Sequence, residues 1–76
     1  MSIKEKNKTL EEVIDKIILL KTTKGLTNYQ LAINSGVNRN VVGRILKKER
    51  SLKAETLFKL IDGLDISLAE FFKSFE

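Results

Sequence analysis

Apolar residues in the first third of the chain recur three or four positions apart, the spacing of one helix face. Thr9, followed three residues later by Glu12, fits a capping box at the start of this helix. Gly25 suits its end, because glycine readily adopts the left-handed conformation that often follows a helix. The pattern therefore predicts a helix from Thr9 to about Lys24. Its inward positions are Leu10, Val13, Ile14, Ile17 and Leu20, whereas Leu19 points away.

Residues 1–8 are polar and show no apolar period, so we predict a flexible, weakly basic tail there. The rest of the chain shows no internal repeat, no low-complexity stretch and no domain boundary. Residues 9–76 are therefore predicted to form a single small domain.

Residues 27–46 predict two short helices joined by a tight turn. Thr27, with Gln30 three residues on, is a second capping box, and Leu31 and Ala32 face inward. Gly36 is best explained by a positive φ in the turn. Asn38 is a strong N-cap for a helix over 39–47. That helix buries Val42, Ile45 and Leu46, and it leaves Arg39, Asn40, Gly43 and Arg44 on its other side.

The last third predicts two more helices, which makes the expected fold class all-α with five helices. One runs from about Ala54 to Asp62 with Gly63 as its terminator, and Phe58 lies off its apolar stripe. Ser67 and Glu70 form a third capping box. The helix that they begin carries more apolar residues than a terminal helix needs, so a second copy is expected to bury some of them. The predicted dimer interface is Leu68, Phe71, Phe72 and Phe75.

The composition excludes several classes of function. The chain has no cysteine and no histidine, which removes disulfides, zinc fingers, thiol nucleophiles and the usual metal ligands. Its four glycines form no phosphate-binding loop. We therefore expect no enzyme and no cofactor. No stretch resembles a signal peptide or a membrane span, so a cytoplasmic protein without membrane association is expected.

The formal net charge of +4 is unevenly distributed. Residues 36–53 hold six cations and one acid, a net charge of +5, whereas residues 54–76 carry −3. A solvated surface is the ordinary explanation for a charge of +4 alone. A cluster on one segment instead favours a polyanionic partner.

The exposed side of 39–47 has side chains suited to reading DNA bases. Arginine can donate to guanine O6 and N7, and asparagine can pair with adenine N6 and N7. Val41 either meets a thymine methyl or flanks the core. Gly43 reflects close approach to bases, close helix packing or neutral drift. The predicted base contacts are Arg39, Asn40, Val41, Gly43 and Arg44. The predicted phosphate contacts are Thr27, Asn28, Asn38, Lys47, Lys48, Arg50 and Lys53.

These residues resemble a known family. The pattern Leu26-Thr27-x-x-x-Leu31-Ala32-x-x-x-Gly36-Val37-x-Arg39-x-x-Val42-x-Arg44-Ile45, with the leucines near the C-terminus, is similar to the Cro and lambda-repressor-like (XRE-type) helix-turn-helix family. The resemblance implies a five-helix domain whose third helix is the recognition helix. It also implies base contacts by Arg39, Asn40 and Arg44, and a phosphate contact by Asn28 that can brace a recognition side chain.

We therefore expect a sequence-specific regulator of transcription, repressor-like, that binds a palindromic double-stranded DNA operator as a homodimer. The alternative is an antitoxin or anti-regulator that acts as a protein-interaction module through the Phe-rich terminal helix. Its partner would then be a toxin or another regulator.

Overall fold

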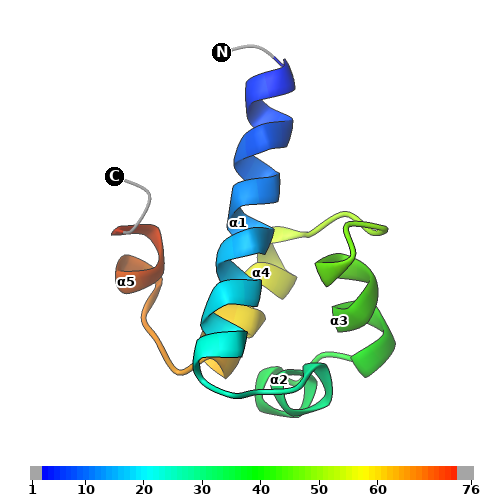
Figure 1. The fold of residues 1–76 in the computed structure, drawn as a ribbon, viewed down its shortest axis with the longest axis vertical. Coiled ribbons are helices and arrows are strands. Elements are labelled where there is room, and N and C mark those ends of the chain that lie inside the picture. The colour runs from blue at the N-terminus through cyan, green and yellow to red at the C-terminus, as the bar shows by residue number, and fades with distance from the viewer. Residues whose placement is uncertain (1–2, 74–76) are drawn as a thin grey trace.

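The structure, a computed structural model, describes the backbone of residues 3–73 and the side chains of residues 10–73. The helices, in chain order, are α1 (Ile3–Thr23), α2 (Asn28–Ser35), α3 (Arg39–Leu46), α4 (Ala54–Gly63) and α5 (Leu68–Lys73). No strand occurs among the described residues, and the predicted all-α class with five helices is confirmed. Figure 1 shows α1 at the centre, with α3 and α5 on opposite sides of it.

The core collects the apolar faces of all five helices. α2 packs against α4 and α3, α3 also packs against α1, and α5 packs on α4. The largest fully buried side chains are Ile17, Leu31, Val42, Ile45, Leu60, Ile61, Leu64 and Phe71. Burial of each such side chain stabilises the fold by about 1.5–3 kcal/mol relative to its exposure. The helix periods read from the sequence therefore place most of the core correctly. Leu10 is the exception: it is predicted to face inward but is 39% exposed, because it borders an open groove between α1 and the segment after α3.

The start of α1 differs from the prediction. The helix begins at Ile3, so residues 3–8 are helical and Thr9 lies inside the helix. A residue in that position cannot serve as the N-cap, because the cap flanks the first helical turn. The lysines and glutamate of residues 4–8 are good helix formers, which explains how the helix continues without an apolar face. The division into a tail of 1–8 and a domain of 9–76 stays a prediction.

The turns around α2 follow the sequence closely. Gly25 (φ 71°) and Gly36 (φ 68°) both adopt the left-handed conformation. The Thr27 hydroxyl accepts from the Gln30 amide at 3.0 Å, and the Gln30 side chain accepts from the Thr27 amide at 2.9 Å. The capping box is thus complete, and both ends of α2 are held by local hydrogen bonds.

Gly63 does not take the left-handed conformation of a glycine that follows a helix, which corrects the prediction. It is the last helical residue and is buried, and Asp65 (φ 61°) adopts the left-handed conformation instead. A Cβ atom on Gly63 would overlap the Ser35 hydroxyl and lie 3.0 Å from the Ser35 backbone nitrogen. The Asn34 side-chain amide also donates to the Gly63 carbonyl at 3.5 Å. Gly63 therefore permits the close approach of α2 to α4.

α5 begins as predicted but uses its aromatic residues differently. The Ser67 hydroxyl accepts from the Glu70 amide at 3.0 Å. Phe71 is fully buried in the core of the single chain, so it has no surface to offer a second copy. Leu68 and Phe72 remain 44% and 41% exposed, and they carry the predicted interface. Phe75 lies outside the described residues.

We expect substitution by alanine to change stability in opposite directions at Gly63 and Gly43, the two glycines that lie within helices. Gly63→Ala should lower the free energy of unfolding by about 1–3 kcal/mol, because the new methyl group meets backbone that cannot rotate away. Gly43 has nothing near its missing Cβ, so Gly43→Ala should raise stability by about 0.5–1 kcal/mol through helix propensity. Urea denaturation of both variants measures this, and a stabilised Gly63→Ala would contradict the packing assigned here.

Candidate nucleic-acid interface

The N-terminal ends of α2 and α3 border an open surface hollow of about 520 Å³. Cations, side-chain amides and one bare backbone position surround it. Its lining is Asn28, Arg39, Asn40, Gly43, Arg44, Lys47 and Glu49. All of these except Glu49 are residues that the sequence predicts to contact DNA. The fold thus brings them together from two helices onto one face, which we call the α2–α3 face.

Capping side chains fix the first turn of α3. The Asn38 side-chain oxygen accepts from the Asn40 amide at 2.8 Å, which confirms the predicted N-cap. The cap holds the backbone of Arg39 and Asn40 in the first turn, so their side chains leave from defined positions. Asn38 and Thr27 both use an oxygen as a capping acceptor, and each still has a side-chain donor for a phosphate. Their phosphate contacts stay predictions.

The middle of α3 separates an inner from an outer side. Val42 is fully buried, whereas Val41 is only partly buried beside it. Gly43 lines the hollow, and no atom lies within 4 Å of where its Cβ would be. Close helix packing therefore does not explain this glycine. Close approach to bases and neutral drift are the alternatives that remain, and the first stays a prediction.

The sequence did not predict a role at this face for Tyr29 or Glu49. The Arg39 guanidinium lies over the Tyr29 ring, 5.5 Å from its centroid. Glu49 places a carboxylate at the rim of the basic hollow. Tyr29 stands one residue into α2 and ten residues from Arg39, so no local pattern signals their contact. Glu49 is the only acid within residues 36–53, and this is the one signal that could have singled it out.

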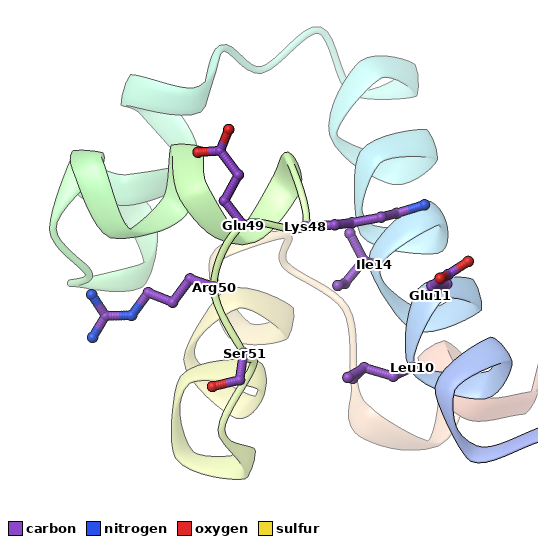
Figure 2. A pocket seen from close by; sticks show the side chains of 7 residues that line it. All are labelled: Leu10, Glu11, Ile14, Lys48, Glu49, Arg50 and Ser51. Atoms are coloured by element: carbon purple, nitrogen blue, oxygen red, sulfur yellow. The ribbon is translucent and has the colours of Figure 1, made fainter. Parts of the chain in front are cut away.

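Lys48 is placed differently from the other basic residues. It follows the end of α3 with φ 64°, and its amide donates to the Ile45 carbonyl. Its ammonium lies 2.9 Å from an Asp15 carboxylate oxygen of α1. Figure 2 shows the Lys48 side chain running toward α1 while Arg50 points the opposite way. Lys48 thus links the segment after α3 to α1, and its phosphate contact stays a prediction.

The Asp15 contact also changes the acid–base behaviour of Lys48. The hydrogen bond to Asp15 raises the pKa of Lys48 above its ordinary value of 10.5. Desolvation opposes this rise, and the charges of Asp15 and Glu11 add to it. A raised folded-state pKa means that the ion pair stabilises the fold fully below pH 10.5. The contribution is lost as the pH rises through the folded-state value.

The remaining predicted phosphate contacts lie outside the hollow. Arg50 belongs to a separate groove of about 330 Å³ between α1 and the segment after α3. Lys53 precedes α4 as an N-cap without a side-chain capping bond, and it is exposed. The structure thus does not bring these two residues together with the α2–α3 face. Their phosphate contacts stay predictions.

Comparison with known proteins agrees with this geometry. The family model described as helix-turn-helix (HTH_3) matches residues 16–71. The chain belongs to the XRE-type helix-turn-helix family. The wild-type restriction-modification controller protein C.Esp1396I has a similar structure, with a TM-score of 0.80, 30% sequence identity, and coverage of 84% of this chain and 82% of that one. No curated protein matches.

Membership of the XRE-type family confirms several expectations. The chain is a DNA-binding helix-turn-helix domain with the lambda-repressor-like fold, and the family consists of transcription regulators rather than enzymes. In this family fold, α2 and α3 are the helix-turn-helix. Within the described residues, no helix has both the length and the apolar character needed to cross a membrane.

The Lys48–Asp15 tie predicts a specific thermodynamic pattern. Lys48→Gln and Asp15→Asn should each lower the melting temperature, and the double variant should lose less than the sum because both changes break one interaction. Lys47→Gln removes the same charge without a carboxylate partner among residues 10–73, and it serves as the control. Thermal denaturation at neutral pH and above pH 11 tests this. Strictly additive losses would contradict the tie.

Proposed function

We propose that this protein is a sequence-specific regulator that binds a palindromic duplex operator as a homodimer and represses transcription by occupying it. The hollow of the α2–α3 face is the observation that carries the proposal. It gathers Arg39, Arg44 and Lys47 with the amides of Asn28 and Asn40. Bidentate donors beside point charges match what base edges and phosphates require.

The shape of α3 suits insertion into a major groove. The groove is about 12 Å wide and admits one helix. Arg39, Asn40 and Arg44 lie within the first two turns on the exposed side of α3, and Gly43 between them presents only backbone. This arrangement supports a recognition helix whose backbone comes close to the base edges. Asn28, at the start of α2, lies beside it for a phosphate contact.

α5 offers a surface for a second copy. Leu68 and Phe72 are both partly exposed apolar residues on this helix. Figure 1 shows α5 on the opposite side of α1 from α3, so pairing through α5 leaves both recognition helices uncovered. A two-fold dimer would present them to successive major grooves, with half-sites about 34 Å apart. The likeness to a restriction-modification controller protein supports a regulatory role of this kind.

Selection of duplexes from a random pool at low salt tests the proposal directly. We expect a palindromic sequence, which would report both base preference and dimer symmetry. Binding should weaken steeply with salt, with a slope of log K against log salt of about −0.9 for each phosphate neutralised. A protein that enriches no duplex at low salt is not a sequence-specific operator binder, and an interaction module through α5 would then be favoured.

Substitutions on α3 should separate base reading from phosphate holding. Arg39→Ala and Asn40→Ala should each weaken binding to the selected duplex by about 1–3 kcal/mol and relax preference at one position. Lys47→Ala should weaken all duplexes alike and reduce the salt slope by about 1. Fluorescence anisotropy with the selected duplex and single-base variants measures both effects. A uniform loss in Asn40→Ala would contradict its assignment to base reading.

The dimer prediction is tested by charge on α5. The double variant Leu68→Lys/Phe72→Lys should be monomeric where the wild type is dimeric, because two buried ammonium groups oppose association. Ile33→Lys changes a residue on α2 that is 60% exposed, and it is the control for added charge. Sedimentation velocity at high micromolar concentration gives the mass. A monomeric wild type, or a dimeric α5 variant, would exclude this interface.

A further inference from the structure

The cation–π contact between α2 and α3 sits at the edge of the α2–α3 face. The Arg39 guanidinium lies 5.5 Å from the centroid of the Tyr29 ring, within the range of about 6 Å over which a ring attracts a cation. Tyr29 is 53% exposed, so the core does not explain its aromatic side chain. Within residues 10–73 the structure gives Arg39 no ion pair. Tyr29 is thus the group that orients this guanidinium.

We propose that Tyr29 is a positioning residue that holds Arg39 for guanine recognition and thereby sets base preference at one operator position. The inference rests on the proposed function, since it concerns a base contact. The family resemblance implies a brace at Asn28, the first residue of α2. The contact in this chain comes instead from the next residue, through a ring face rather than a side-chain amide.

The geometry of a guanidinium explains why a ring can hold it without blocking it. Its five N–H donors lie in the plane of the group, whereas the ring is attracted to the face of that plane. A guanidinium held over the Tyr29 ring therefore keeps the N–H donors that point beyond the ring free for guanine O6 and N7. A carboxylate partner would occupy the same donors and compete with the base. The Tyr29 contact therefore orients Arg39 and leaves its chemistry available.

The contact favours DNA binding mainly because Arg39 gives up part of its rotamer freedom before it meets the base. An unrestrained arginine gives up rotamer entropy when it is fixed against a base, and the cost falls on the affinity. A side chain already held over a ring loses less on binding. The benefit applies only where Arg39 meets its preferred base, so it adds to discrimination as well as to affinity. Removal of the ring should weaken binding to the selected duplex about three- to tenfold.

The test compares Tyr29→Leu with Tyr29→Phe. Tyr29→Phe keeps the ring face and should bind the selected duplex within twofold of wild type. Tyr29→Leu removes the ring but keeps an apolar side chain on an exposed helix position, and it should show the three- to tenfold loss. The loss should be confined to duplexes that carry the preferred base pair opposite Arg39, because a general loss of fold would weaken all duplexes. Melting temperatures of the two variants check that the fold is unchanged.

A double-mutant cycle with Arg39→Ala completes the test. In the Arg39→Ala background, Tyr29→Leu should have no further effect, because there is no guanidinium left to hold. An equal loss in both backgrounds, or a loss in Tyr29→Phe, would show that Tyr29 touches DNA itself and would overturn the inference. A Tyr29→Leu variant with wild-type affinity and base preference would overturn the inference but not the proposed function. A wild type that selects no duplex would overturn both the inference and the proposed function.

Discussion

The close approach of α2 to α4 is the contact on which the DNA-facing surface depends. Gly63 has no side chain where it meets the backbone of Ser35, and this absence lets α2 settle onto the core. α2 is short and buries only Leu31 and Ala32, so it has little other anchorage. α3 rests on α2 and α1 in turn. Any change that moves α2 away from α4 would therefore also move the hollow that α2 and α3 share.

The basic side chains in and after α3 point in two directions. Arg39, Arg44 and Lys47 border the hollow of the α2–α3 face. Lys48 emerges on the other side and meets Asp15 on α1. An exposed ion pair contributes modestly to stability. The pair joins the segment directly after α3 to α1.

The α2–α3 face and the exposed part of α5 lie on different sides of the core. The α2–α3 face carries the polar and cationic groups, and Tyr29 orders one of them in advance. α5 carries the exposed Leu68 and Phe72 on the far side of α1. The core between them contains no buried charged or polar residue among those described. The two surfaces therefore use different side chains, with an apolar core between them.

The sequence by itself determined the features that depend on neighbours within about four residues. Helix periods, the Thr27 and Asn38 caps and the turns at Gly25 and Gly36 all follow from local hydrogen bonding and backbone sterics. The family motif identified the helix-turn-helix. The extent of α1 was misjudged, because its first turns have helix propensity without the apolar period that the prediction relied on.

Tertiary structure alone decided which partner each ambiguous side chain meets. From the sequence alone, each of four residues could have had more than one contact. In the structure, Phe71 is buried in the core and Gly63 approaches Ser35 closely. Lys48 pairs with Asp15, and the Tyr29 ring contacts the Arg39 guanidinium. Each of these contacts joins segments far apart in the chain or on different helices, and no periodicity encodes such distances. Local physics therefore specified the helices, and packing between them specified the site.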